Sequence, residues 1–169
     1  MYAPVLEEHG FDTSKMSLKN IRLVVAGDIY KWMLKVKNLI SEGADVSVLD
    51  NYNGEGSIVK AYILSGIDTD KLHEVSRFLF EQGVKPTPEL FVDAVMKDTG
   101  LAEIVMKAAN GAIDVNTLDF YGESSHDWVL CNTILGRYPE TIKYLISKGL
   151  HTSTKNISID DIIRMKQRR

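Results

Sequence analysis

The chain has 169 residues, of which 44% are apolar and 25% charged, and its formal net charge is −3. This composition is typical of a soluble globular domain and excludes a disordered chain. The small acidic excess gives no basis for holding nucleic acid through its phosphates. The longest purely apolar run, Leu23–Ala26, is far below the roughly 18 residues that span a bilayer, and residues 1–8 lack a secretory signal pattern. We therefore expect a cytoplasmic protein, with a secreted effector left open.

A short sequence motif occurs twice. Val46–Asp50 returns as Val115–Asp119, 69 residues later, and each copy follows a Gly-Ala pair and an Asp and precedes a turn that contains Gly and Glu. This distance is about twice the ~33-residue period of one class of helical repeat. A fixed period of this size indicates stacked repeats, which usually act by binding.

The first segments in chain order are an entry arm and a helix pair. Residues 1–16 contain Pro4 and Gly10 and have no apolar period, so we interpret them as the arm. Ser17 is placed to cap a helix whose apolar positions are Leu18, Ile21, Val24 and Val25. A second apolar stripe, Trp32–Ile40, ends at Gly43, where glycine can take the left-handed conformation that closes many helices.

The middle of the chain repeats this arrangement. Residues 50–56 are rich in Asn and Gly and predict a turn, after which Ser57 opens a short helix interrupted by Gly66. The next helix begins with the acceptors of Asp68-Thr69-Asp70 and ends at Gly83. Thr87-Pro88 then places a capping hydroxyl before a proline at the first helical position.

The last part predicts two further helix pairs and a terminal helix. Gly100 is expected to mark a joint, and Asn110-Gly111 a helix end. A helix follows Ser124 and turns at Gly136, and Pro139 opens the next, which closes at Gly149. Ser158–Lys166 predicts a short helix with Ile159, Ile162 and Ile163 on one side, followed by a basic tail. No segment alternates like a strand, so we expect an all-α fold in which short helix pairs stack to bury their apolar faces.

These residues resemble ankyrin repeats. Leu39–Val46 is similar to the loop that ends such a repeat, 111–116 is similar with one inserted residue, 119–124 resembles the turn that follows, and Thr87-Pro88 keeps the start of the inner-helix signature. No repeat carries the full Thr-Pro-Leu-His signature. The resemblance implies a solenoid of about four repeats over residues 17–154, with a C-terminal capping helix and basic tail over 155–169.

Groups with possible chemistry are scattered along the chain. The four histidines have no short mutual spacing, so we expect no metal site, no cofactor and no enzymatic activity. His126-Asp127 follows Ser124-Ser125, but a turn before a helix favours capping over a catalytic triad. Asp68–Asp70 and Asp160–Asp161 are typical of helix starts, and Cys131 is expected to be a small buried hydrophobe.

In the ankyrin family, loop tips and inner helices line a concave surface that receives another protein. Carried onto this chain, the resemblance implies partner-binding residues at its turn tips. They are Asp50, Asn51, Tyr52, Asn53, Lys85, Asp119, Phe120, Tyr121 and Glu123. Exposed aromatic residues are enriched at interfaces, although the three aromatic side chains of this set could equally pack against neighbouring repeats.

The expected function is therefore a non-catalytic protein–protein interaction module. It would bind another protein and inhibit or scaffold it, as an immunity or antitoxin-like inhibitor or an adaptor, with no nucleic acid or membrane partner. The sequence leaves the oligomeric state open and favours a monomer. Two alternatives stay open: an effector that engages host proteins through its repeats, and a small-molecule binder or enzyme.

Overall fold

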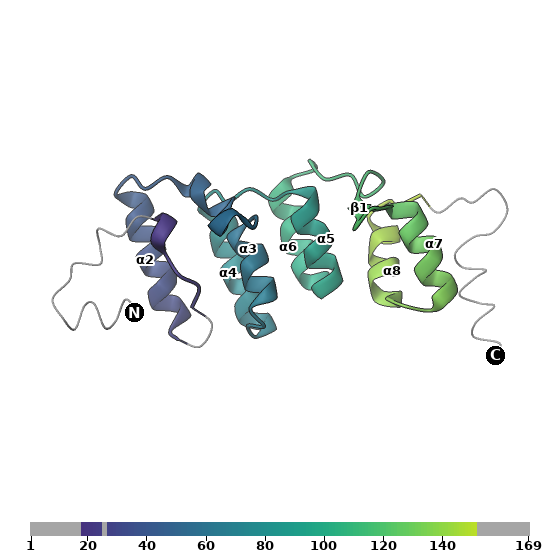
Figure 1. The fold of residues 1–169 in the computed structure, drawn as a ribbon, viewed down its shortest axis with the longest axis horizontal. Helices are drawn as coiled ribbons and strands as arrows, with labels where there is room; N and C mark the ends of the chain where they lie inside the picture. Colours follow the sequence, from purple (N-terminus) through teal and green to yellow (C-terminus); the bar gives the residue numbers. More distant parts are fainter. Residues whose placement is uncertain (1–17, 25–26, 152–169) are drawn as a thin grey trace. The chain divides into compact units, whose positions relative to one another are not determined.

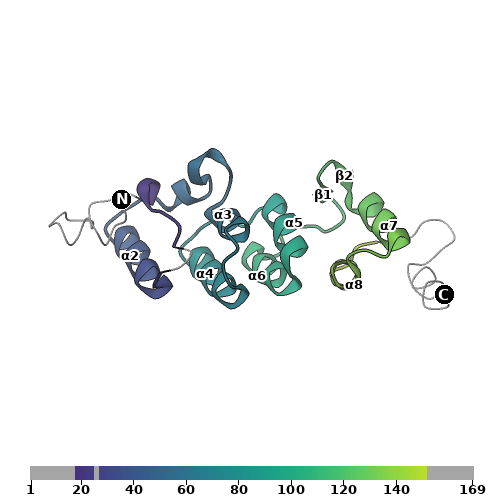
Figure 2. The same ribbon diagram turned by 60° about the horizontal axis from the view of Figure 1, so that its bottom comes forward.

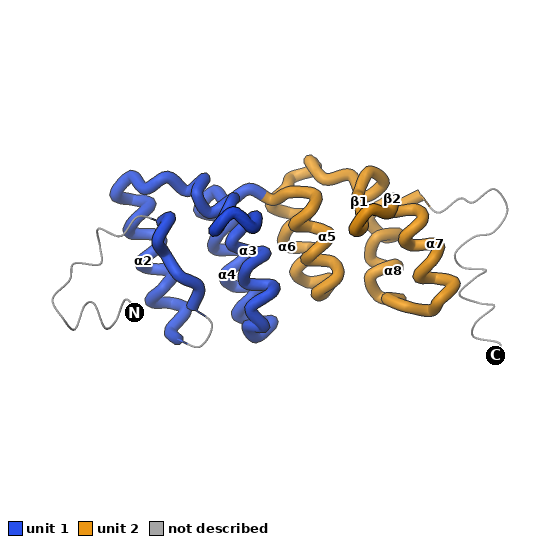
Figure 3. Tube along the Cα trace, in the orientation of Figure 1, with its two compact units in different colours: residues 1–85 blue, residues 86–169 orange. Residues whose placement is uncertain are grey.

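A computed structural model of the chain describes residues 18–24 and 27–151 (Figure 1). The protein is mostly helical, as the sequence predicts, and the described residues include one small sheet of two strands. Two compact units divide the chain, residues 1–85 and residues 86–169 (Figure 3). The predicted entry arm (1–16), the helix Ser158–Lys166 and the basic tail lie outside the described residues.

Unit 1 contains one long helix and a helix pair. The elements are η2 (Leu18–Asn20), α2 (Ile29–Ser41), η3 (Val46–Leu49), η4 (Tyr52–Gly54), α3 (Ile58–Leu64) and α4 (Thr69–Glu81). Helix α4 contacts both α2 and α3 (Figure 2), and the core between them includes Val36, Tyr62 and Leu72. The predicted caps are confirmed at Ser57 and Asp68, whose side chains accept hydrogen bonds from backbone N–H groups of the first turn.

The helix predicted after Ser17 does not form. Only one 3₁₀ turn, Leu18–Asn20, is present, and residues 21–24 have no helical structure. Three side chains hold this segment: Trp32 Nε1 donates to the carbonyl of Arg22 (2.8 Å), Tyr52 Oη donates to that of Ile21 (3.1 Å), and the hydroxyl of Tyr62 accepts from Val24 N–H (3.3 Å). Because other elements satisfy its backbone, the segment buries Leu18 and Ile21 without helix formation.

Unit 2 consists of two helix pairs with a hairpin between them. Its elements are α5 (Pro88–Lys97), α6 (Thr99–Ala109), β1 (Asp119–Phe120), β2 (Glu123–Ser124), α7 (Ser125–Leu135) and α8 (Pro139–Ser147). The strands are antiparallel, with Asp119 opposite Ser124 and Phe120 opposite Glu123. This hairpin departs from the expectation of no strands.

Helix starts in unit 2 follow the sequence with one correction. Thr87 caps α5 with Pro88 in its first turn, and Pro139 opens α8, as predicted. The joint expected at Gly100 lies at Asp98 instead. The extended backbone of Asp98 ends α5, and its carboxylate accepts from Leu101 N–H to cap α6, so Gly100 lies inside the first turn of α6.

Four helices end in the same way, which confirms the predicted role of the glycines. Ala44, Val84, Arg137 and Leu150 each donate their N–H to the carbonyl five residues earlier, at 2.8–3.1 Å. The residue before each of them is a glycine with φ between 67° and 102°. This pattern is the Schellman closure, which requires a left-handed residue. Helix α6 differs, because it ends at Asn110 in the left-handed conformation (φ 47°), followed by Gly111.

Candidate protein-binding surface

Five of the nine predicted partner-binding residues lie in unit 1. Two of these five, Asp50 and Lys85, connect two loops by a hydrogen bond. The carboxylate of Asp50 accepts a hydrogen bond from the backbone N–H of Lys85 at 2.7 Å. A similar bond recurs in unit 2, where the side-chain oxygen of Asn116 accepts from His151 N–H at 2.8 Å. In both cases the donor is 35 residues beyond the acceptor. Each loop that contains the repeated motif is therefore hydrogen-bonded to the loop that follows the next helix pair.

The tip of the first turn is formed by Asn53 and Gly54. Both have positive φ, 54° and 80°, and Tyr52 lies just before them with its N–H bonded to the carbonyl of Gly56 (2.7 Å). Tyr52 is half-buried, and its hydroxyl is bonded to Ile21, whereas Asn51 and Asn53 are exposed. Tyr52 therefore stabilises unit 1, and the surface of this tip is polar.

The second turn separates its two aromatic residues. Phe120 is only 1% exposed, and its ring stacks on Trp128 with centroids 4.5 Å apart. This burial removes Phe120 from the surface that a partner could touch. Tyr121, the next residue, is 71% exposed. Within strand β1, Asp119 is exposed and Phe120 is buried, because successive side chains in a strand point to opposite sides. Tyr121 lies beyond the strand, in the turn, where its left-handed backbone (φ 58°) accompanies an exposed ring.

Tyr121 lies at the tip of a tight hairpin. Tyr121 and Gly122 have φ of 58° and 95°, and the carboxylate of Asp119 accepts from Gly122 N–H. Positive φ at both central positions is the geometry of a two-residue type I′ turn. The Tyr121 hydroxyl donates to Asp93 of α5 at 3.4 Å. Partial burial raises the pKa of that hydroxyl, and the negative charge of Asp93 adds to the effect. Asp119 and Glu123 are exposed beside it.

A second tyrosine belongs to this surface and was missed by the sequence prediction. Tyr138, 45% exposed, precedes Pro139 with a left-handed backbone (φ 52°), and its ring lies 5.6 Å from that of Trp128. Tyr138 adds a small electrostatic contribution to the raised pKa of Tyr121. The available signal was its position between Gly136 and Pro139, where the chain must turn.

Of the groups with possible chemistry on α7, Ser124 and Asp127 form the start of the helix. Ser124 caps α7: its Oγ accepts from Asp127 N–H (3.2 Å) and donates to the Asp127 carboxylate (2.6 Å), which confirms the capping prediction, while His126 is exposed. Cys131 was expected to be buried and is exposed. The reason is helical phase, because the buried side of α7 is formed by residues such as Trp128, Val129 and Asn132. Within 18–24 and 27–151, no three His, Cys, Asp or Glu side chains gather to hold a metal ion.

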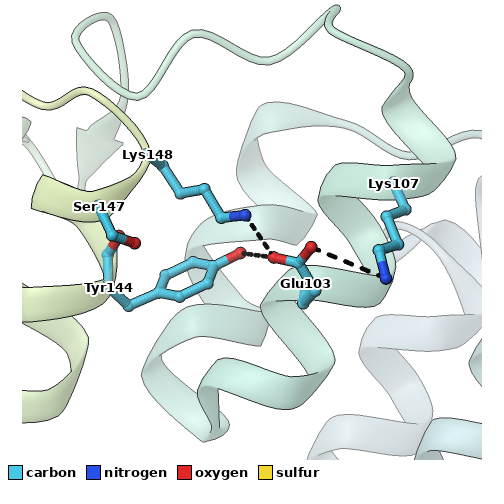
Figure 4. Close-up of polar contacts among 5 residues, drawn as sticks. All are labelled: Glu103, Lys107, Tyr144, Ser147 and Lys148. Carbon is cyan, nitrogen blue, oxygen red and sulfur yellow. Dashed lines mark hydrogen bonds and ion pairs between the residues drawn. The ribbon is translucent and has the colours of Figure 1, made fainter.

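Charged groups also connect two helices of unit 2 (Figure 4). Glu103 of α6 accepts hydrogen bonds from the amine of Lys148 (2.6 Å) and the hydroxyl of Tyr144 (3.0 Å), and Lys107 lies at 3.9 Å. The bond from Lys148 is the main reason why the pKa of Glu103 is lowered, while burial is the main reason why that of Tyr144 is raised. The two lysines offset the charge of Glu103 and the hydroxyl of Tyr144 donates to it, so this cluster is a structural connection between α6 and α8.

No protein-family model, curated protein or solved structure matches this chain.

None of the helices in the described part of the chain combines the length and apolar character needed to cross a membrane.

Proposed function

We propose that the chain is a non-catalytic protein-interaction module of ankyrin-like helix pairs, which binds a protein partner and thereby inhibits or scaffolds it. The observation that carries the proposal is the pair Tyr121 and Tyr138. Both are exposed, and both hold the left-handed backbone conformation that costs a non-glycine residue roughly 1–2 kcal/mol. Two large aromatic side chains kept on the surface at such a cost have the features of interface anchors.

The repeated local structure supports the ankyrin-like part of the proposal. Four helices share one closure, and Asp45 and Asp114 each accept a hydrogen bond from the backbone N–H two residues later at 2.9 Å. The bonds from Asp50 and Asn116 to N–H groups 35 residues ahead fit a unit length near the ~33 residues of that family. The pairs α3–α4, α5–α6 and α7–α8 would each be one repeat.

The charge around the tyrosines indicates the class of partner surface. Residues 86–151 contain nine Asp and Glu against five Lys and Arg. Asp93 touches Tyr121, and Asp119 and Glu123 flank it in the hairpin. Aromatic rings beside carboxylates favour a partner segment that carries Arg or Lys, since a cation can contact both. We propose a basic, protein-borne surface as the partner of this region.

The test begins with capture of partners by the tagged chain and mass spectrometry, followed by Kd measurements with the purified partner. Tyr121→Asn should weaken binding about thirtyfold or more, since loss of an aromatic anchor costs about 2 kcal/mol. Asn tolerates the left-handed conformation, so the thermal midpoint should stay the same or rise. Raising the salt concentration should also weaken binding to a basic partner.

Matched controls separate a local surface from a general loss of structure. Tyr30→Ala removes another exposed tyrosine, on α2 of unit 1, and should leave Kd unchanged. The change Tyr52→Ala combined with Tyr121→Ala should be no weaker in binding than Tyr121→Ala alone, because Tyr52 is bonded within unit 1. Normal binding by Tyr121→Asn and by Tyr138→Ala would reject the proposal. Loss of partner binding in folded His126→Ala protein would also reject it.

A further inference from the structure

Helix α7 is apolar on two sides, unlike an ordinary surface helix. Its buried side carries Trp128 and Val129. On another side, Cys131 is exposed, Ile134 is 58% exposed and Leu135 is 53% exposed. Residues spaced by three and four positions lie on one face of a helix, so these three side chains form a second apolar stripe, which we call the outer stripe.

The outer stripe lies at one end of unit 2. Helix α8 contacts α6, whereas α7 contacts α8 and the hairpin β1–β2. Figures 1 and 2 both show α7 at the end of unit 2 that is farthest from α5 and α6. The described residues therefore leave the outer stripe without the apolar cover that α5 receives from α6.

The chain itself contains a segment suited to this face. After His151, eighteen residues follow, and among them Ile159, Ile162 and Ile163 have the same spacing of three and four as the outer stripe. As a helix, the nine residues Ser158–Lys166 would be roughly 13 Å long, close to the length of α7. Six residues link this segment to His151, and they can span up to about 20 Å.

The order of elements earlier in the chain also favours this occupant. Gly43 and Gly111 are followed, 14 and 13 residues later, by Ser57 and Ser124, the serines that cap the next helices. Gly83 is followed after only four residues by Thr87, which caps α5. Gly149 closes its helix in the same way, and Ser158 follows it by nine residues, within this range. The helices that begin after Gly43, Gly83 and Gly111 are thus capped by a side chain, whereas α8, which begins after Gly136, is not.

We propose that Ser158–Lys166 docks on the outer stripe of α7 as an amphipathic helix, with Ile159, Ile162 and Ile163 against Cys131, Ile134 and Leu135. This inference does not rest on the proposed function. It would remove the exposed apolar side chains of the outer stripe from water, which is favourable in proportion to the apolar area covered.

Cys131 provides a direct test, because it is the only cysteine of the chain and belongs to the outer stripe. Its reaction with a thiol reagent such as dithiobis-nitrobenzoate should be slow in the native full-length protein. The full-length variant with Ile162→Asp and Ile163→Asp should react at least tenfold faster, with the rest of the helical circular dichroism retained. The matched control, Arg168→Asp with Arg169→Asp, should react like the native protein.

Two outcomes would overturn the proposal. One is equal labelling rates in the native protein and the Ile162/Ile163 variant. The other is protection of Cys131 that disappears on dilution, which would make a second copy the occupant. A second variant avoids reliance on a disruptive change: Ile162→Cys should form a disulfide with Cys131 within one chain under mild oxidation. Only intermolecular disulfides, or none, would contradict docking.

Discussion

The two copies of the repeated motif, Val46–Asp50 and Val115–Asp119, share their first contacts and then diverge. Asp45 and Asp114 open both loops with an identical hydrogen bond, and Leu49 and Leu118 are buried in both. The tips that follow also share a geometry, a left-handed residue and then a left-handed glycine. The first tip uses Asn53 for the left-handed position and the second uses Tyr121.

The two tips differ in how well the residue fits the left-handed position of the turn. Asn is enriched in the left-handed conformation because its short amide bonds locally, whereas a bulky tyrosine there is uncommon. The first tip therefore has the residue that the turn itself favours. The second tip has a residue that the turn itself does not favour, and the contact that the structure gives this residue is the hydrogen bond from its hydroxyl to Asp93.

The largest expected effect concerns the residue just before each tip, Phe120 in one turn and Tyr52 in the other. Phe120→Ala should lower the free energy of unfolding by about 3–5 kcal/mol, because it empties a buried site against Trp128. Urea denaturation followed by circular dichroism measures this loss. Phe120→Leu, which keeps most of the volume, should cost clearly less. A loss below 1 kcal/mol for Phe120→Ala would mean that Phe120 is not part of the core.

The sequence predicted much of the fold because short-range rules decide it. Helix caps at Ser57, Asp68 and Thr87 and closures at Gly43, Gly83 and Gly149 depend only on neighbouring residues, and all are present. The segment 21–24 has an equally good helical pattern and is not helical. Its backbone partners, Trp32, Tyr52 and Tyr62, come from 10 to 38 residues away, and no local pattern reports them.

The candidate surface was predicted less well for a related reason. Counting from Asp50 and Asp119 pairs Tyr52 with Tyr121, but the first turn has one extra residue before its tip. The backbone instead matches Tyr52 with Phe120, and both are directed inward. A shift of one residue relative to the turn tip decides whether an aromatic side chain is buried or exposed. The spacing of residues in the sequence does not determine this shift.

The next effect tests the inward role of Tyr52. Tyr52→Phe removes only the hydroxyl that donates to Ile21. One lost hydrogen bond costs about 1 kcal/mol, so the urea midpoint should fall modestly, with the residues around Ile21 losing amide protection first. Tyr30→Phe removes a hydroxyl that donates to Glu74 at the exposed surface (3.0 Å), where water can replace the bond, and should change the midpoint less. Equal effects of the two variants would mean that the bond from Tyr52 to Ile21 contributes no more to stability than a hydrogen bond at the surface.

Replacing the left-handed residue of each tip by that of the other should change the stability of the two units in opposite directions. Tyr121→Asn relieves a left-handed tyrosine and should stabilise unit 2, whereas Asn53→Tyr introduces one and should destabilise unit 1, each by about 1 kcal/mol. Thermal denaturation of the two variants against the native chain measures both signs. If Tyr121→Asn is instead destabilising by more than 1 kcal/mol, the bond to Asp93 outweighs the backbone cost. The second tip would then be explained by stability alone.

The smallest effect concerns the part that both copies share, and it depends on pH. Hydrogen bonds from Ser47 lower the pKa of the Asp45 carboxyl below its ordinary 3.8, and the backbone N–H of Asn116 is the main cause of the same shift at Asp114. A carboxyl with a lowered pKa in the folded state stabilises the fold fully above pH 3.8, and the contribution is lost as the pH falls through the lowered value. Asp45→Ala and Asp114→Ala should therefore each lower the denaturation midpoint at pH 7 by similar amounts. The gap from the native protein should narrow as the pH falls below 3.8, because the native chain loses the contribution that the variants already lack. A gap that stays constant down to pH 2 would show that the charge of the carboxylate is not what closes these loops.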